Sequence, residues 1–394
     1  MEKIIIIGGG GTGAALAHDL TGRGFEVSLF ERGELFSGAT GRHHGLLHSG
    51  ARYAVNDPTA ARECFHENQI LRKIAPYAIE QNDGLFVAVD DEDLEFEPAL
   101  LEGCAKAGIP TSTLTGEEAR ELEPALSPDT TRAVRVPDAV IDAYRLPLSF
   151  AASACANGAR LHRFHEVEEI LFSGSRVSGV KVRDHRREET REVKGDLVIN
   201  AAGAWAGRLA KLADVNLPIQ PGPGVMVAIN GRLTERVINH MSPAGEGDII
   251  LPQRKLSIVG TSLWLAENPD DVGVPRDHVE KMLRLGSRLI PAIAEKPITA
   301  TWSASRPLIR DDRWLEAPQQ MSRTFQCYDH EALDGKPGLF SVIGGKATTL
   351  RAMAELTANE VCQKLGRPEL RCRTADEVLL PPRALARVHQ EVRP

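Results

Sequence analysis

The first thirty residues alternate between apolar runs and a glycine-rich turn. Residues 4–7 form a continuous β-branched run, which is typical of a strand buried on both faces of a parallel sheet. A glycine run follows at 8–13, and the pattern predicts a helix over 14–20 and a second parallel strand over 27–30. The chain therefore opens with a predicted βαβ unit.

Later segments repeat helix and strand patterns at longer intervals. Asp57 and Pro58 suit the N-cap and the first position of a helix over 56–75, which Pro76 ends. Further predictions are helices near 94–107, 149–156, 277–289 and 348–365, a hairpin turn at 173–175, and strands at 197–200 and 339–343. Strand-to-helix units thus recur at the start, the middle and the end of the chain.

This recurrence predicts an α/β fold with two interleaved parts. A Rossmann-like nucleotide-binding domain is expected to be assembled from three segments, 1–84, 138–217 and 334–380. A β-rich substrate domain is expected at 85–137 and 218–333, and 381–394 is expected to be a tail. The length of 394 residues fits two such domains.

Composition narrows the class of protein. Apolar residues make up 42% and charged residues 26%, as in ordinary globular proteins, and the net charge of −7 argues against a nucleic-acid partner. No apolar run approaches the length of a transmembrane helix, and the N-terminus lacks a signal-peptide pattern. We therefore expect a cytoplasmic protein, or one peripheral on the inner face of the membrane. The six cysteines form no CxxC pair, which favours reduced thiols over a disulfide, zinc or iron–sulfur framework.

The opening glycine run has the GxGxxG spacing of a dinucleotide site, with Gly8, Gly10 and Gly13 in its three positions. Glu31 ends the next predicted strand, where a carboxylate can bind ribose hydroxyls and repels a 2′-phosphate. A second strand–Gly-Gly–helix junction follows at 339–348. A helix N-terminus there can face the electron-rich edge of a flavin, so FAD is favoured over NAD.

Several long motifs resemble those of the FAD-dependent glycerol-3-phosphate dehydrogenases, within the D-amino-acid-oxidase-like flavoproteins. They are "IIIIGGGGTGAALAHDL", "GATGRHHGLLHSGARYAVNDPTAARECFHENQILRKIA", "DLVINAAGAWAGRLA", "SASRPLI" and "SVIGGKATTLRAMAE". The large catalytic subunit of the anaerobic type is the most similar. The resemblance implies hydride transfer from C2 of sn-glycerol 3-phosphate to N5 of FAD, which yields dihydroxyacetone phosphate.

The resemblance also implies roles for individual residues. Arg52 and Tyr53 would face the substrate, and Arg306 would hold the reacting alcohol and stabilise its developing alkoxide. Arg323 would contact the phosphate, and Lys346 would lie near both flavin and substrate. His48 would lie beside the flavin ring. Outside these motifs, His240 is a candidate substrate residue, although no histidine is assigned as the general base.

The FAD contacts expected from the same motifs form a longer set. They are Gly8, Gly10, Thr12, Gly13, Glu31, Arg32, Thr40, Gly41, Arg42, His44, Gly45, Leu46, Val167, Ala201, Ala202, Gly203, Trp205, Gly344, Gly345, Lys346, Ala347 and Thr348. The close spacing of His43, His44 and His48 also raises a metal site, but the loop supplies no nearby acidic or thiol ligand, so none is predicted.

Three positions depart from the family pattern on its expected substrate side: Pro223, Trp264 and Leu350. The likeness also stops before the cysteine-rich domain of the anaerobic enzyme, so a quinone, an electron-transfer protein or oxygen is the expected electron acceptor. Two alternatives stay open. One is an oxidase or dehydrogenase of a 2-hydroxy acid, amino acid or secondary amine, and the other is a flavin-binding subunit of a larger dehydrogenase complex. Several cations, suited to a small anionic and phosphorylated substrate, favour the first interpretation.

Overall fold

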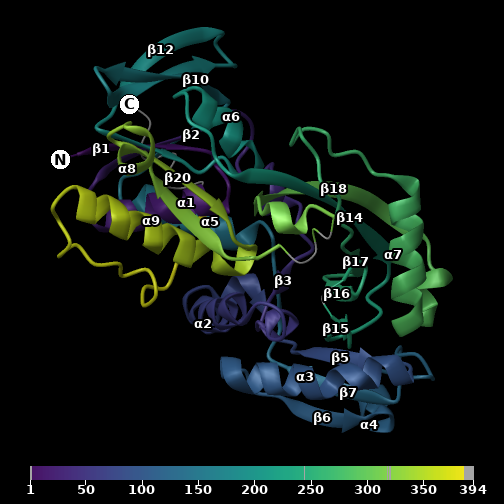
Figure 1. Cartoon of the computed structure of the whole chain (residues 1–394). Helices are drawn as coiled ribbons and strands as arrows, with labels where there is room; N and C mark the ends of the chain where they lie inside the picture. The colour runs from purple at the N-terminus through teal and green to yellow at the C-terminus, as the bar shows by residue number, and fades with distance from the viewer. Residues whose placement is uncertain (1, 244, 317, 319–320, 386–394) are drawn as a thin grey trace.

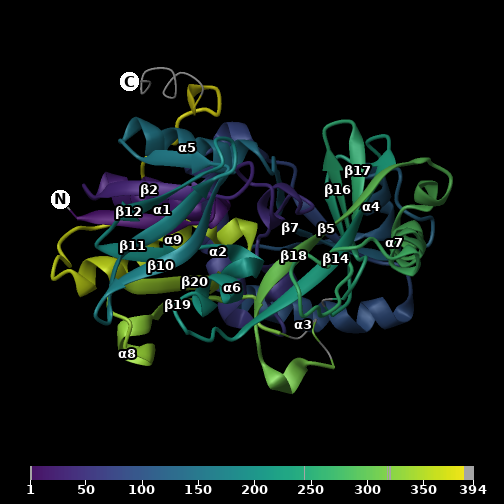
Figure 2. The ribbon, with the colours of Figure 1, turned by 90° about the horizontal axis from the view of Figure 1, so that it is seen from above.

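The computed structural model describes residues 2–243, 245–316, 318 and 321–385. The predicted tail therefore lies partly outside the described residues, from 386 onward. Two sheets, each with its own helices, form two bodies that lie side by side (Figures 1 and 2). No helix in the described part of the chain is both long and apolar enough to cross a membrane.

The first body is built on a six-stranded sheet whose order is β19–β20–β13–β1–β2–β9. All neighbours are parallel except β19, which pairs antiparallel with β20. The strands are β1 (Lys3–Ile7), β2 (Glu26–Glu31), β9 (Arg160–Arg163), β13 (Leu197–Asn200), β19 (Phe325–Asp329) and β20 (Leu339–Gly344). They come from the start, the middle and the end of the chain, so the predicted assembly of a Rossmann-like domain from separate segments is confirmed.

Both faces of this sheet are covered. Ile4 and Ile6 pack with the helices on one face, while Ile5 and Ile7 pack against a small antiparallel sheet on the other. The helices are α1 (Gly11–Gly22), α5 (Arg145–Ala156) and α9 (Leu350–Lys364), and the small sheet is β10 (His165–Ser173), β11 (Arg176–Asp184) and β12 (Glu189–Lys194). Short helices α6 (Ala206–Lys211) and α8 (His330–Asp334) complete the body. This double burial explains the uninterrupted β-branched run of β1.

The second body is built on an eight-stranded sheet of order β18–β14–β17–β16–β15–β5–β7–β6. Its strands are β5 (Gly84–Ala88), β6 (Ser112–Thr115), β7 (Arg132–Val136), β14 (Ile219–Asn230), β15 (Val237–His240), β16 (Ile249–Gln253), β17 (Leu256–Gly260) and β18 (Ile298–Ile309). Its helices are α3 (Asp91–Ala107), α4 (Gly116–Leu122) and α7 (Arg276–Leu289). The predicted β-rich body is therefore present, with helices α3 and α7 where the pattern places them.

Helix α2 (Pro58–Ile74) and a three-stranded sheet connect the two bodies. Asp57 caps α2, because its Oδ1 accepts a hydrogen bond from Ala60 N at 3.1 Å, as the sequence predicts. The three strands are β3 (Leu46–Leu47), β4 (Ile79–Glu80) and β8 (Ala139–Ile141). The exact domain boundaries stay a prediction, but β19, predicted to belong to the substrate domain, pairs within the first body.

Candidate active site

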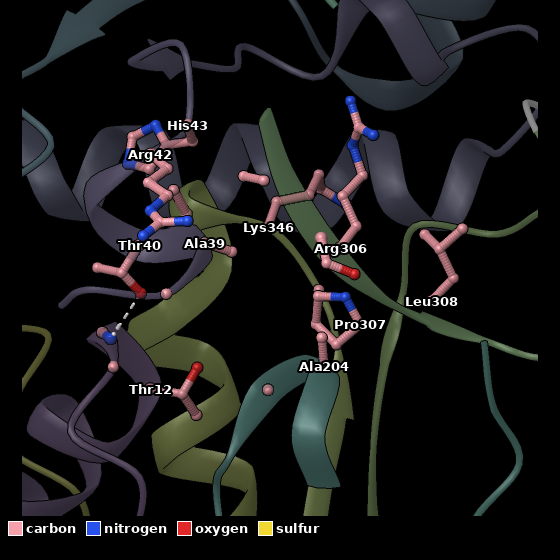
Figure 3. A pocket seen from close by; sticks show the side chains of 18 of the residues that line it. Thr12, Ala39, Thr40, Arg42, His43, Ala204, Arg306, Pro307, Leu308 and Lys346 are labelled. Atoms are coloured by element: carbon pink, nitrogen blue, oxygen red, sulfur yellow. Dashed lines mark hydrogen bonds between the residues drawn. The ribbon is translucent and has the colours of Figure 1, made fainter. Parts of the chain in front are cut away.

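A cavity of about 1750 Å³ lies between the two bodies. It is larger than the roughly 300–1000 Å³ of an ordinary small-molecule site, and therefore has room for a dinucleotide and a second ligand. Figure 3 shows Thr12, Thr40 and Arg42 on one side of it and Arg306 on the other, with Lys346 between them.

The glycines of the first turn allow α1 to begin at this cavity. A Cβ on Gly13 would lie 2.0 Å from the carbonyl oxygen of Gly8, so the turn closes only without a side chain there. Thr40 Oγ1 accepts a hydrogen bond from Gly11 N at 2.9 Å. Gly10 provides no side-chain cap and the first turn contains no acidic residue, so the positive end of α1 is suited to a pyrophosphate.

Glu31 lies at the end of β2, where an acid is predicted to bind ribose. Its two carboxylate oxygens accept hydrogen bonds from Gly9 N at 2.8 Å and Gly33 N at 2.9 Å, which fixes the carboxylate at the edge of the cavity. The next residue, Arg32, stacks its guanidinium over the Trp205 ring at 4.8 Å. The helix terminus, the acid and the size of the cavity together fit FAD.

Most residues expected to contact FAD line this cavity. They are Gly8, Gly10, Thr12, Glu31, Arg32, Thr40, Arg42, His44, Leu46, Val167, Ala201, Ala202, Gly203, Trp205, Gly344, Gly345, Lys346 and Ala347. Gly13, Gly41, Gly45 and Thr348 lie behind the lining and shape it instead. A Cβ on Gly41 would meet the carbonyl of Phe36 at 2.5 Å, and Thr348 Oγ1 accepts a hydrogen bond from His48 N at 3.1 Å.

Arg306, on β18, brings an unpaired positive charge to the cavity. Its guanidinium donates to Gly222 O at 3.1 Å, Thr261 Oγ1 at 2.6 Å and Ser262 O at 3.2 Å, all of which are neutral. Burial, followed by the nearby Arg323 cation, lowers the pKa of Arg306 to about 9. The side chain is therefore still charged at neutral pH, in surroundings that favour an added anion.

Two further cations lie close to Arg306. Lys346, just before the turn into α9, donates from Nζ to Arg323 O at 2.7 Å and lies 4.8 Å from the centre of the Tyr53 ring. Burial lowers the pKa of Arg323 and raises that of Tyr53. Three positive charges thus converge on one end of the cavity.

Arg52 is held differently, because it has a carboxylate partner. Its Nη2 bonds to Asp248 Oδ2 and donates to Gly245 O at 2.9 Å, and the two charged side chains are 9% and 5% exposed. Its charge is therefore largely balanced within the protein.

The histidines of this loop are neutral at neutral pH. Burial, aided by His44 and Lys346, holds the pKa of His48 well below its usual range, and burial lowers that of His43 to about 4. Among the described residues, neither ring nitrogen of His48 has a hydrogen-bond partner, whereas Nδ1 of His44 accepts from Leu46 N at 3.0 Å. No group of three metal-binding side chains occurs in the part of the chain that the structure describes.

The structure does not bring His240 to the cavity. It ends β15, and its Nε2 lies 2.7 Å from Asp93 Oδ1 on α3. Pro223 and Trp264 also lie off the described lining. Trp264 donates its backbone N–H to Pro223 O at 3.1 Å and packs on His278, so only Leu350 of the three departures faces the site.

Sequence reasoning missed several charged residues of the lining. They are Glu246, Asp248, Asp270, Lys281 and Arg208. Each lies in or beside an irregular segment without a motif, and its partner is distant in the sequence. Asp248 is 196 residues from Arg52, so no local pattern reveals the pair.

Known proteins resemble this chain at both sequence and structure level. One subunit of the anaerobic glycerol-3-phosphate dehydrogenase of Haloferax volcanii is 42% identical over 387 residues, 96% of this chain and 66% of that protein. The subunit of the same name from Escherichia coli (strain K12) is 40% identical over 382 residues, 96% of this chain and 70% of that protein. The chain thus spans about two thirds of the length of these curated relatives.

Two solved structures share the fold. Glycine oxidase from Geobacillus kaustophilus has a TM-score of 0.76 at 22% identity, over 92% of this chain and 95% of that one. The glycerol-3-phosphate dehydrogenase from Bacillus halodurans complexed with FAD has a TM-score of 0.74 at 22% identity, over 99% and 71%. The family model described as "FAD dependent oxidoreductase" matches residues 3–359. This chain belongs to that family and is an FAD-dependent oxidoreductase.

Proposed function

We propose that this enzyme oxidises sn-glycerol 3-phosphate to dihydroxyacetone phosphate. The observation that carries the proposal is the convergence of Arg306, Arg323 and Lys346 on one end of the cavity. Among the described residues, no carboxylate hydrogen-bonds to the side chain of Arg306 or Lys346. A phosphate dianion needs several such cations, whereas one carboxylate needs fewer. The curated relatives at about 40% identity carry the name of this activity.

The side chains divide the work of binding and charge stabilisation. Bound FAD supplies the hydride acceptor that turns a secondary alcohol into a ketone. Arg323 and Lys346 bind the phosphate, and Arg306 donates to the reacting oxygen and stabilises the charge that develops on it. Arg52, balanced by Asp248, donates a hydrogen bond to a substrate hydroxyl rather than adding net charge.

His48 is the proposed proton acceptor. A base must be neutral before it can accept the hydroxyl proton, and the lowered pKa of His48 keeps its ring neutral at neutral pH. The ring has no protein partner among the described residues, and it lines the cavity with Tyr53 at a ring-centre distance of 5.2 Å. A substrate hydroxyl can therefore reach a ring nitrogen without displacing a hydrogen bond.

Anaerobic reduction of the bound flavin tests this proposal. The purified holoenzyme is expected to lose its oxidised-flavin absorbance with sn-glycerol 3-phosphate and to keep it with glycerol, which lacks the phosphate. Glycine, proline and lactate serve as the comparison for the alternative substrates. Bleaching by one of these, with none by sn-glycerol 3-phosphate, would overturn the assignment; no bleaching by any of them would favour a flavin-binding subunit.

We also propose that a partner protein or a quinone takes up the electrons, in the cytoplasm or at the inner face of the membrane. The names of the curated relatives support a partner, since each is called a subunit. Turnover with a soluble quinone and slow turnover with oxygen are the expected results. Rapid stoichiometric production of hydrogen peroxide would instead make the enzyme an oxidase.

A further inference from the structure

The segment 267–274 crosses from the second body to the first. It leaves the eight-stranded sheet after β17 and leads into α7. At its centre, Asp270 Oδ1 accepts hydrogen bonds from Trp205 Nε1 at 2.7 Å and from Arg32 Nη2 at 3.4 Å, and Oδ2 accepts from Arg208 Nη1 at 2.6 Å. One carboxylate thus joins three side chains of the first body.

Neighbouring residues strengthen this attachment. Asn268 Oδ1 accepts from Arg208 Nη2 and from the backbone N–H of Asp270, the latter at 2.9 Å. Val272 O accepts from the hydroxyl of Ser303 on β18. The segment is therefore fastened at one end to its own body and at its centre to the other.

The segment covers the nucleotide half of the cavity. Asp270 and Val272 line it together with Glu31, Arg32 and Trp205, and Glu31 marks the expected ribose position. FAD bound with its ribose at Glu31 lies beneath the segment, so the cofactor cannot leave on that side while the Asp270 contacts persist.

The contacts of Asp270 are weak enough to open. The side chains of Arg32, Arg208 and Asp270 are 46%, 45% and 46% exposed. Exposed ion pairs contribute little stability each and are screened by salt. We propose that segment 267–274 is a latch, closed by Asp270, which opens to admit and release FAD. This inference concerns the cofactor and does not depend on the identity of the substrate.

Rates of FAD exchange in Asp270→Asn and Asp270→Ala test the latch. Release is followed by the rise in flavin fluorescence after dilution of the holoenzyme, and rebinding by its quenching when apoenzyme is mixed with FAD. Both rates are expected to rise on the order of tenfold in Asp270→Asn and further in Asp270→Ala, so that the equilibrium affinity changes less than either rate. Added salt is expected to speed FAD release from the wild type more than from Asp270→Asn.

Asp271→Asn is the matched control. It makes the same change of charge at the next position, and within the described structure the exposed Asp271 side chain has no hydrogen bond. Exchange rates in this variant are expected to equal those of the wild type. Unchanged release in Asp270→Asn would overturn the latch. Faster release with unchanged rebinding would also overturn it, because Asp270 would then act as a direct FAD contact.

Discussion

Replacing Arg306 with methionine is expected to abolish most substrate oxidation without unfolding the enzyme. Arg306 has two guanidinium nitrogens at the cavity and only neutral hydrogen-bond partners among the described residues. A hydrogen bond to a charged group contributes about 1.5–3 kcal/mol. Two such bonds to substrate oxygens total about 3–6 kcal/mol, so kcat/KM is expected to fall about 10²- to 10⁴-fold.

The same variant is expected to remain folded for an electrostatic reason. The lowered pKa of Arg306, about 9, means that burial of its charge costs free energy in the absence of an anion. Methionine removes this cost while it loses three hydrogen bonds, so we expect a melting temperature within about 2 °C of the wild type.

Anaerobic stopped-flow reduction of the flavin by sn-glycerol 3-phosphate measures the effect. Arg306→Lys keeps the charge but loses the forked geometry, and is expected to fall between wild type and Arg306→Met. Arg310→Met is the control, because Arg310 follows the same strand but pairs with Asp312 at 2.7 Å on the surface. A reduction rate in Arg306→Met close to that of the wild type would refute the role of this cation.

Three other substitutions probe the fold beneath the site. Gly13→Ala is expected to lower the flavin content of the purified protein, because the new Cβ would lie 2.0 Å from Gly8 O. Glu67→Gln leaves the buried Arg351 without its charged partner at 2.5 Å, and should cost about 3–5 kcal/mol, or about 4–6 °C in melting temperature for a chain of this length. Burial lowers the pKa of His18 from 6.5, so its folded form stays neutral while the unfolded chain takes up a proton, and stability is lost as the pH falls through 6.5. His18→Leu is expected to reduce this slope by up to about 1.4 kcal/mol per pH unit, as measured by urea unfolding between pH 5 and 8.

Each of these substitutions has a control on the surface. A Cβ on Gly22, at the other end of α1, would meet no atom within 4 Å, so Gly22→Ala should keep full flavin content. Glu102→Gln breaks an ion pair with Lys106 whose side chains are 67% and 69% exposed, and should shift the melting temperature by no more than about 1 °C. His66→Gln changes an exposed histidine on α2 and should leave the pH dependence as it is. A Gly13→Ala variant as yellow as Gly22→Ala would contradict the steric argument.

Local signals make the nucleotide half of the cavity predictable. The β-branched run of β1, the glycines and Glu31 lie within 31 residues, and each has a physical requirement that few other residue types meet. The N-cap Asp57 and the start of α2 are predictable for the same reason, because capping depends on neighbours three residues away. Where a structural requirement is local, residue type and spacing are enough.

The substrate half depends on contacts between distant segments, which the pattern does not reveal. The sequence pattern assigns β19 to the second body, and only its pairing with β20 brings it into the first. His240 is a reasonable candidate by residue type, but Asp93 on α3 pairs with it away from the cavity. Asp248 and Asp270 carry no motif, and their importance is apparent only once Arg52 and Arg208 are beside them.

The loop between β2 and α2 joins the two halves of the cavity into one unit. Thr40 contacts the start of α1, and Arg52, twelve residues later, pairs with Asp248 of the second body. Between them, Asn68 of α2 donates from Nδ2 to His48 O at 3.2 Å, and Asp138 accepts from Ser49 N at 2.7 Å. Because these supports are buried, a shift at the cofactor end of the loop is transmitted to the substrate end through backbone hydrogen bonds. A single segment therefore sets both where FAD lies and where Arg52 meets the substrate, which explains why its glycines and its charges occur together.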